Sequence, residues 1–184
     1  MSINGLEVWT KLIGEFNAYN ILATYSLAKA YDLIEDKILN NISALETVEG
    51  RFEKISKNGI SKIGIVDYAH SPDSIKKILQ TLNELKAKDE FLITVIGCGG
   101  DRDVDKRPLM GKIAASLSDK VVFTSDNPRF EDPKSILKQI KSGVEYKDLH
   151  KVSIIVDRKK AIKYACEINS KNDVILIAGK GHEK

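Results

Sequence analysis

Between residues 62 and 178 the sequence alternates short apolar runs rich in β-branched residues with stretches of helical period. The apolar runs are KIGIV, FLITVIG, KVVFT, VSIIV and DVILIA, at 62–66, 91–97, 120–124, 152–156 and 173–178. The stretches between them, at 71–86, 107–117, 132–143 and 158–168, are amphipathic. Near-continuous apolar strands separated by amphipathic helices are typical of a parallel sheet that is covered on both faces. The pattern therefore predicts a doubly wound α/β domain with a mostly parallel sheet.

The first of these helical stretches shows the pattern most clearly. One helical face carries five apolar side chains, namely Ile75, Ile78, Leu79, Leu82 and Leu85. Ser71 stands where an N-cap is expected and Pro72 in the first turn, which are the preferred residues for those positions. The sequence thus predicts a helix over 71–86 with its apolar face toward the sheet.

The chain before residue 48 has a different pattern. Apolar residues recur at helical spacing from Asn17 to Tyr31, including Leu22 and Leu27, and a second helix is indicated over 34–43. This is too little apolar surface for an independent core. We expect residues 1–47 to be a short helical piece at the end of a larger domain, and residues 48–184 to form the α/β domain.

Composition excludes several classes of protein. The 29 basic and 26 acidic residues leave a net charge of +3, and the lysines are scattered, so neither nucleic-acid nor membrane binding is indicated. Cys98 and Cys166 have no second thiol or histidine at ligand spacing, which argues against a structural metal site and against disulfides. No apolar stretch approaches the ~20 residues needed to cross a bilayer. We expect no metal ligands in this chain, no membrane insertion and a cytoplasmic location.

The unusual stretches of the chain all follow predicted strands. They are DYAH at 67–70, GCGGDRD at 97–103, SDNPR at 125–129, DR at 157–158 and GKGHE at 179–183. In an open parallel sheet, ligands bind beyond the carboxyl ends of the strands, where loops and helix N-termini converge. The sequence therefore predicts one binding site at that edge.

The residue types at this edge favour a zwitterionic ligand. Arg102 and Arg129 offer planar forks for carboxylates or phosphates, and Asn127 adds a neutral donor and acceptor. Pro128 restricts the backbone of its neighbours. Glu183, with the carbonyl groups of a glycine-rich turn, could receive an ammonium group. An amino acid would satisfy both kinds of group.

Simpler interpretations stand beside this one. Asp103, Asp157 and Arg158 are interpreted as surface ion pairs, and His70 could equally be a turn residue or face a ligand. GCGGDR does not fit the dinucleotide-binding pattern G-x-G-x-x-G, and no stretch matches the phosphate-binding loop G-x-x-x-x-G-K-[ST]. The residues alone therefore indicate an α/β domain that binds anions and amines, without specifying a reaction.

A resemblance extends this interpretation. In order, the motifs GEFNAYN, EGRFE, VDYAHSPD, GCGGDRDVDKRPLM, TSDNPRFEDP, DR and AGKGHE span nearly the whole chain. The series resembles the C-terminal part of the Mur ligases, in the form that adds meso-diaminopimelate. The resemblance implies that residues 1–47 are the end of a central ATPase domain and that residues 48–184 are a Rossmann-like domain that receives the amino acid. The last residues of that domain in the family have no counterpart in this sequence.

The resemblance also implies a reaction. ATP would phosphorylate the D-glutamate carboxylate of UDP-N-acetylmuramoyl-L-alanyl-D-glutamate, with Mg²⁺ neutralising the phosphoryl oxygens, and an amine of meso-diaminopimelate would attack the acyl phosphate. The residues it assigns to the amino acid are Arg102, Asp126, Asn127, Pro128, Arg129, Gly179 and Glu183. Those it assigns to ATP are Asn17, Asn20, Arg51, Asp67, Tyr68 and His70. The protein is expected to be a monomer.

Two alternatives remain open at this stage. Lysine-adding members of the family usually differ from SDNPR, and lysine lacks the second carboxylate that Arg129 and Asn127 could bind. A free-standing nucleotide-binding α/β protein is disfavoured by the missing dinucleotide pattern. Because the phosphate-binding loop and the lysine that the family carbamylates are absent, we expect no catalytic residue in this chain and no activity from it alone.

Overall fold

The computed structural model describes residues 1–56, 63–170 and 172–183. The chain forms two compact units, Met1–Val48 and Glu49–Lys184, which are described in turn. Lys62, where the first predicted strand begins, lies outside the described residues.

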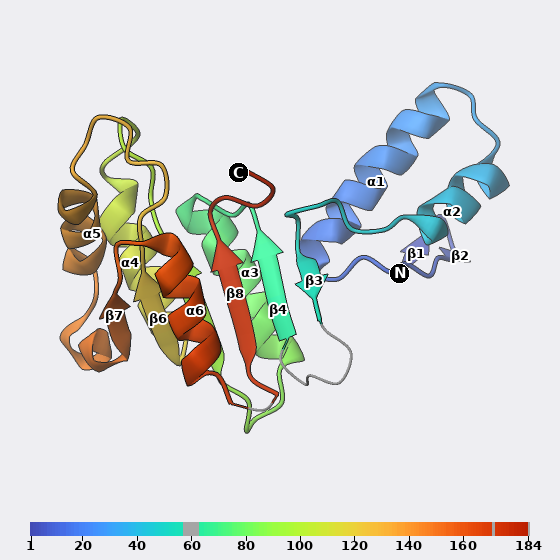
Figure 1. Ribbon diagram of the computed structural model, residues 1–184. Helices are drawn as coiled ribbons and strands as arrows, with labels where there is room; N and C mark the ends of the chain where they lie inside the picture. Colours follow the sequence, from blue (N-terminus) through green and yellow to red (C-terminus); the bar gives the residue numbers. More distant parts are fainter. Residues whose placement is uncertain (57–62, 171, 184) are drawn as a thin grey trace. The chain divides into compact units, whose positions relative to one another are not determined.

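The first unit contains a short hairpin and two helices (Figure 1). The hairpin pairs β1 (Ser2–Ile3) with β2 (Leu6–Glu7), and the helices are α1 (Glu15–Ala30) and α2 (Glu35–Ala44). Its small core joins the side chains Ile3, Val8, Ile21, Tyr25, Ile38 and Ile42. Leu22 and Leu27, which the helical period grouped with Ile21 and Tyr25, are instead 49% and 61% exposed. The buried stripe of α1 is therefore narrower than the sequence predicted.

The second unit is built on one sheet (Figure 1). Among its described residues the strands are β3 (Glu53–Ile55), β4 (Ile63–Asp67), β5 (Leu92–Ile96), β6 (Lys120–Phe123), β7 (Val152–Ile154) and β8 (Val174–Ala178). Their order is β3-β4-β8-β5-β6-β7, with every neighbouring pair parallel except β3 and β4. The predicted mostly parallel sheet is confirmed. The antiparallel edge strand β3 was not predicted.

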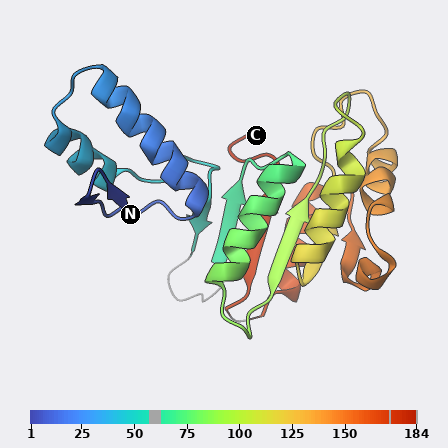
Figure 2. The same ribbon diagram turned by 180° about the vertical axis from the view of Figure 1, so that it is seen from behind.

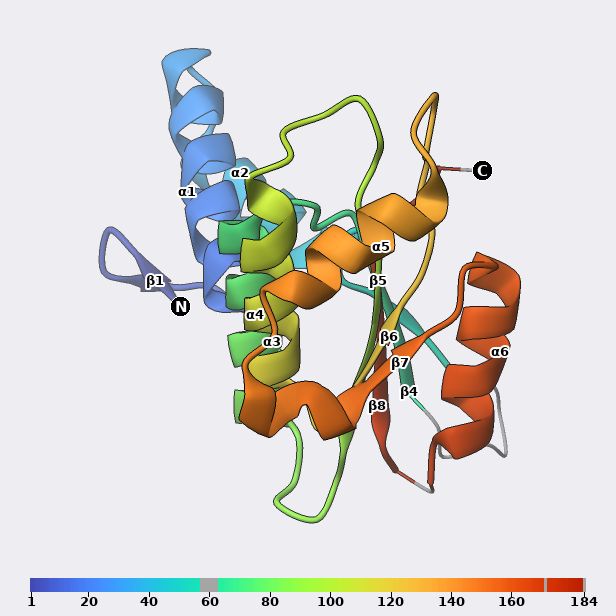
Figure 3. The same ribbon diagram turned by 90° about the vertical axis from the view of Figure 1, so that its left-hand side faces the viewer.

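Helices cover both faces of this sheet, as predicted. They are α3 (Pro72–Leu85), α4 (Lys106–Leu117), α5 (Pro133–Ser142) and α6 (Arg158–Ile168), with the short 3₁₀ helix η1 (Tyr146–Lys151) before β7. Figures 2 and 3 show α3, α4 and α5 on one face and α6 on the other. The connections through α3, α4 and α5 lead from β4 to β5, β6 and β7, toward one edge of the sheet, whereas α6 leads back from β7 to β8. Because each of these crossovers is right-handed, the one that runs in the opposite direction lies on the opposite face.

The core follows from the alternation of side chains along each strand. Ile93, Val95, Val122 and Ile175 pack against α6, which presents small residues such as Ala161 and Ala165. The alternate positions, among them Leu92, Ile96, Phe123 and Leu176, are fully buried under the other helices. Four of the five residues on the predicted face of α3 are buried, and Leu85, at its end, is 59% exposed.

Three helices begin with a side-chain cap at the carboxyl edge of the sheet. The hydroxyl of Ser71 accepts a hydrogen bond from the backbone N–H of Ser74 in a capping box, which confirms the predicted N-cap of α3. Asp132 caps α5 and Asp157 caps α6. Each cap satisfies otherwise unpaired N–H groups of a first helical turn.

The described helices include no segment long and apolar enough to span a membrane.

Candidate functional site

The motif stretches gather at one edge of the sheet. The chain leaves the carboxyl ends of β4, β5, β6, β7 and β8 through them, and the parallel register places these ends together. We call this edge the rim; its segments are 67–71, 97–105, 124–132, 156–158 and 178–183. The prediction that they share one edge is confirmed.

The segments after β5 and β6 are bound to each other through backbone groups. The N–H of Gly100 donates to the carbonyl of Asn127 at 2.8 Å, and Nη1 of Arg129 donates to the carbonyl of Gly100 at 2.6 Å. Arg129 has a left-handed backbone, with φ of 49°, and its N–H points to Oδ1 of Asn127 at 3.4 Å. The two segments therefore form one connected piece of the rim.

Glycines permit this close approach. A Cβ at Gly100 would lie too close to the carbonyl oxygen of Pro128 for any side chain to fit there. A Cβ at Gly99 would lie 2.9 Å from Nη1 of Arg129 and 3.8 Å from Cγ of Arg102. The stem of Arg102 and the guanidinium of Arg129 thus lie beside the same glycine.

Asp126 connects this piece to the end of β8. A Cβ at Gly179 would lie 2.8 Å from Oδ2 of Asp126 and 3.8 Å from the carbonyl oxygen of Gly97. Gly179 has φ of 111°, a conformation that side chains rarely adopt. The carboxylate of Asp126 therefore faces the turn that carries Glu183.

Tyr68 is the centre of a second group of side chains. Its hydroxyl donates to Oε1 of Glu183 at 2.8 Å, and the guanidinium of Arg51 lies 4.5 Å from the centre of its ring. The rings of His70 and His182 lie 4.8 and 5.9 Å away, edge-on and stacked. The hydrogen bond to the Glu183 carboxylate and its negative charge raise the pKa of Tyr68. We call Arg51, Tyr68, His70, His182 and Glu183 the Tyr68 cluster; it joins residues predicted for ATP with one predicted for the amino acid.

Asp67 has both carboxylate oxygens engaged by the backbone. Oδ2 accepts from the N–H of Phe52 and Oδ1 from the N–H of Ala69, both at 2.7 Å. Burial raises the pKa of Asp67, and these two hydrogen bonds and the charge of Arg51 oppose that rise. The carboxylate thereby attaches the segment before β3 to the end of β4. Each oxygen retains a lone pair that a hydroxyl group could use.

Asn17 and Asn20 belong to the first unit. They lie in the first turns of α1, where Nδ2 of Asn17 donates to the carbonyl of Ile13 at 2.7 Å and Nδ2 of Asn20 donates to Oδ1 of Asn17 at 3.1 Å. Their amides are partly engaged with each other and with the segment before α1.

The sequence did not single out Arg107. Its side chain is fully buried under the rim in the first turn of α4, where it forms an ion pair with Glu131 at 2.7 Å. Hydrogen bonding to Glu131 raises the pKa of Arg107 and holds the pKa of Glu131 at about 2. The available signal was an arginine among the small and apolar residues of this helix, such as Met110 and Ala114.

The interpretation of Asp157 and Arg158 as surface ion pairs is wrong. Asp157 accepts a hydrogen bond from the N–H of Lys160 as the cap of α6. Nη2 of Arg158 donates to the carbonyl of Ala178 at 2.8 Å, directly before Gly179. Its Nη1 is buried without a hydrogen-bond partner among the described residues. Burial lowers the pKa of Arg158, and the charge of Asp126 opposes that shift.

Two kinds of chemistry find no support at the rim. Within the described ranges no three His, Cys, Asp or Glu side chains are grouped so that they could hold a metal ion. Burial raises the pKa of the Cys98 thiol to about 11, so it stays protonated near neutral pH and is a poor nucleophile.

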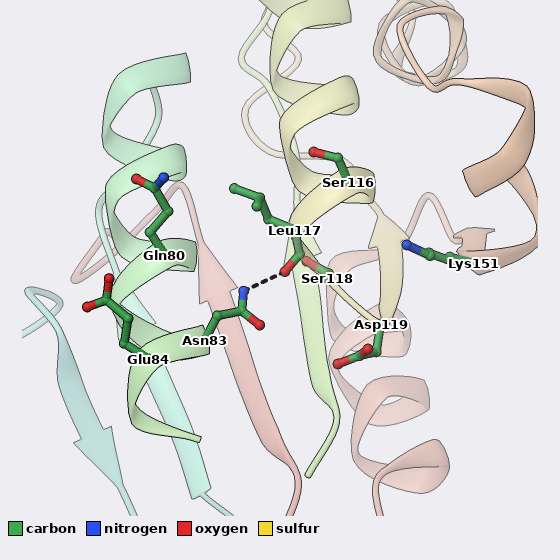
Figure 4. Close-up of a pocket in the computed structure, with 8 residues that line it drawn as sticks. All are labelled: Gln80, Asn83, Glu84, Ser116, Leu117, Ser118, Asp119 and Lys151. Atoms are coloured by element: carbon green, nitrogen blue, oxygen red, sulfur yellow. Dashed lines mark hydrogen bonds between the residues drawn. The ribbon is translucent and has the colours of Figure 1, made fainter. Parts of the chain in front are cut away.

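A hollow of about 400 Å³ lies at the opposite edge of the sheet, between the ends of α3 and α4 (Figure 4). Several of its polar groups serve the fold. Nδ2 of Asn83 donates to the carbonyl of Leu117 at 2.8 Å, and Oδ2 of Asp119 accepts from the N–H of Leu92. None of the predicted site residues lines it, so the candidate site is the rim.

The sequence and the fold of the chain are similar to those of known proteins. Residues 50–181 match the family described as Mur ligase, glutamate ligase domain. The chain is 50% identical over 184 residues to the UDP-N-acetylmuramoyl-L-alanyl-D-glutamate--2,6-diaminopimelate ligase of Cytophaga hutchinsonii, which covers 100% of this chain and 37% of that protein. A solved structure of a ligase with the same name is 38% identical, with a TM-score of 0.68, over 96% of this chain and 35% of that one.

A more distant likeness concerns the fold alone. A Mycobacterium tuberculosis folylpolyglutamate synthase, solved with ADP and AMPPCP, is 24% identical with a TM-score of 0.71, over 94% of this chain and 39% of that one. The chain thus spans between about a third and two fifths of the proteins that it matches.

Proposed function

The chain belongs to the Mur ligase family, with its glutamate ligase domain at residues 50–181, and we propose that it is the amino-acid-binding part of a meso-diaminopimelate-adding ligase. The complete enzyme would join this amino acid to UDP-N-acetylmuramoyl-L-alanyl-D-glutamate, with cleavage of ATP to ADP and phosphate. The observation that carries the proposal is the position of Arg102 and Arg129 beside the same glycine, Gly99. The stem of Arg102 and the guanidinium of Arg129 start from the same place, so the two side chains could together bind a ligand with two carboxylates.

The rim residues would bind and orient the amino acid. Arg129 uses one of its five donors on Gly100, so others are available for the distal carboxylate, with Asn127 beside it. Arg102 would bind the other carboxylate. The distal ammonium would lie between the Gly179 carbonyl and the Glu183 carboxylate, with Asp126 facing that turn. This arrangement would leave the second amino group for acylation.

Pro128, which the resemblance also assigns to the amino-acid site, would together with Gly99 and Gly100 fix this geometry. Pro128 limits the backbone on either side of it, and its carbonyl accepts from the N–H of Glu131 at 2.9 Å. Positioning of this kind can supply much of the rate of an acyl transfer, because the amine is held where it must attack.

The nucleotide would be held at the Tyr68 cluster and Asp67. Arg51 is exposed and stacked on Tyr68, where its charge could meet phosphates. Asp67 could accept a ribose hydroxyl with its remaining lone pairs, and His70 lies exposed beside Tyr68. Asn17 and Asn20, in the first unit, are the further residues that the family resemblance assigns to ATP. ATP would supply the phosphoryl group that activates the acceptor carboxylate.

Among the described residues no three His, Cys, Asp or Glu side chains are grouped so that they could hold Mg²⁺. The rest of the complete enzyme would hold the metal, which would neutralise the phosphoryl oxygens. We further propose that residues 1–47 are the end of the central ATPase domain, that the protein acts in the cytoplasm and that it is a monomer.

The deciding experiment compares amino acids as substrates of the full-length protein that contains this sequence. We expect amide formation, measured as ADP release, with meso-diaminopimelate and little with lysine. Amide formation with lysine and little with meso-diaminopimelate would favour the lysine-adding alternative, and equal rates would contradict the proposed selectivity. No reaction with either would reject the proposed function.

Calorimetric titration of the 184-residue chain tests the assignment of Arg129. We expect weak binding of meso-diaminopimelate, weaker binding of lysine, and loss of the difference in Arg129→Ala. Lys138→Ala is the matched control, since it removes an exposed cation from α5. If lysine bound the unmodified chain as tightly as meso-diaminopimelate, Arg129 would not be the selective residue.

A further inference from the structure

Arg107 is a buried cation that contacts both segments carrying the rim arginines. Its two terminal nitrogens donate to the two oxygens of Glu131, each at 2.7 Å, in a bidentate pair. Nη2 also donates to the carbonyl of Gly99 at 3.1 Å, and Nη1 to Oε1 of Gln139 at 2.6 Å. One guanidinium therefore joins α4, α5 and the segments after β5 and β6.

Glu131 continues the connection on its other side. Its Oε1 also accepts from the N–H of Asp101 at 2.6 Å, and Oδ2 of Asp101 accepts from the N–H of Phe130 at 3.2 Å. Asp101 directly precedes Arg102, and Glu131 follows Arg129 by two residues. The ion pair thus fixes the backbone immediately beside each rim arginine.

Stability alone does not explain a charged pair at this position. Replacing a buried ion pair by apolar side chains of similar size is often neutral or stabilising, because burial of the charges is costly. What apolar side chains cannot supply is a fixed direction, since a bidentate pair orients both partners and the backbone groups bonded to them. The geometry therefore favours a role in orientation.

We propose that Arg107 and Glu131 are positioning residues that set the distance between the Arg102 and Arg129 guanidinium groups, and hence the preference for a ligand with two carboxylates. The identity of the ligand rests on the proposed function. The coupling between the two segments rests on the contacts of Arg107 and Glu131 alone.

The test replaces the pair without leaving a buried charge, in the double variant Arg107→Met/Glu131→Leu of the 184-residue chain. The matched control is Lys112→Met/Glu145→Leu, which removes another ion pair of α4, at 2.9 Å, together with the exposed pair of Glu145 with Lys147, away from the rim. Binding of meso-diaminopimelate and of lysine is measured by calorimetry, and amide hydrogen exchange is measured residue by residue.

We expect the double variant to unfold within a few degrees of the unmodified chain but to bind meso-diaminopimelate about tenfold more weakly, the effect of losing about one charge-assisted hydrogen bond. Lysine binding should change by less than about twofold, since that ligand does not need both guanidinium groups. The amides of Gly100 and Asp101 should exchange at least about tenfold faster, with those of β5 unchanged. The control should alter none of these values.

Unchanged affinity and unchanged exchange at Gly100 and Asp101 would overturn the proposal. If the double variant does not fold, Glu131→Gln takes its place, because it keeps the size of the side chain, and the same criteria apply. If the unmodified chain binds neither amino acid, the activity of the full-length protein decides the proposed function, and hydrogen exchange alone decides whether the pair positions the two segments.

Discussion

The two halves of the rim are held by different kinds of interaction. In the half after β5 and β6, backbone groups bond directly to each other, and the buried Arg107 forms an ion pair with the half-buried Glu131 beneath them. In the Tyr68 cluster, an exposed guanidinium, three rings and one hydrogen bond between side chains hold the residues together. The first half is fixed by the main chain, and the second is held mainly by side chains.

The two kinds of interaction indicate where selectivity can arise. A bidentate contact with a carboxylate loses strength when its partners are displaced, so it requires a fixed backbone. An ammonium or a nucleotide ring tolerates more displacement, because point charges and stacked rings have broad optima. We infer that the half with Arg102 and Arg129 discriminates between amino acids and that the Tyr68 cluster mainly contributes affinity.

The largest expected effect comes from Gly100→Ala. The new Cβ would collide with the carbonyl oxygen of Pro128, a backbone atom that cannot move aside alone. We expect a loss of about 1–3 kcal/mol or more in the free energy of unfolding, the range for overpacking, together with weaker binding of meso-diaminopimelate. Denaturant unfolding gives the first quantity and calorimetry the second.

Gly64→Ala is the control for this substitution. Its Cβ would lie 3.6 Å from the carbonyl oxygen of Ile55, an ordinary contact in the middle of β4. We expect little change in stability there. If both variants were equally stable, the close approach of the two segments at Gly100 would be less demanding than the structure indicates.

Asp67→Asn tests the main-chain anchor beside the Tyr68 cluster. The amide nitrogen that replaces one oxygen cannot accept from the N–H of Phe52 or Ala69, so one buried donor loses its partner. An unsatisfied donor of this kind costs about 1–3 kcal/mol, measured as a shift in the denaturation midpoint. Asp73→Asn, at an exposed ion pair with Lys77, is the control and should change stability by less than about 1 kcal/mol. Equal shifts in both variants would mean that Asp67 does not anchor this half.

The sequence predicted the sheet and its rim because both depend on local pattern. Apolar runs fixed the five parallel strands, and the rule that their carboxyl ends share one edge gathered the motifs. The strand β3 was not predicted because its sequence, EKI, is short and charged, and because an edge strand pairs along one side only. Leu22 and Leu27 were misplaced because their apolar period says nothing about which part of the stripe is covered.

The contacts within the site were less predictable, because they join distant parts of the chain. Arg107 binds Glu131, which is 24 residues away in the sequence. Without knowledge of this partner, a charged residue at the start of a helix is predicted to be exposed. Tyr68 meets Glu183 across 115 residues, which joins two groups that the motifs assigned to different ligands. Pairings of this kind follow from the fold and not from local spacing.

Acid titration should distinguish the two halves of the rim, because the pKa of Glu131 is lowered in one and the pKa of Asp67 is raised beside the other. The pKa of Glu131 lies at about 2, below its usual 4.5, so its contribution to stability is present above about pH 4.5 and is lost as the pH falls toward 2. The pKa of Asp67 is raised above 3.8, so protonation near that pH favours the folded state at this residue. Carboxyl-carbon NMR titration measures both. A Glu131 midpoint near 4.5 would show that the ion pair with Arg107 does not persist in solution.

The smallest effect is expected at the phenol of Tyr68. Its pKa is raised above 10 because the hydroxyl donates to the Glu183 carboxylate, whose charge also opposes the phenolate. The stabilisation from this bond is therefore complete below about pH 10 and is lost as the pH rises through the folded pKa. Absorbance titration should show the Tyr68 midpoint move down toward 10 in Glu183→Gln, whereas Glu167→Gln, on the exposed side of α6, should leave it unchanged. A ligand ammonium bound at Glu183 would also lower this pKa, since it neutralises the same charge. Meso-diaminopimelate that binds without moving the Tyr68 midpoint would place its ammonium away from Glu183, and the Tyr68 cluster would then serve the nucleotide alone.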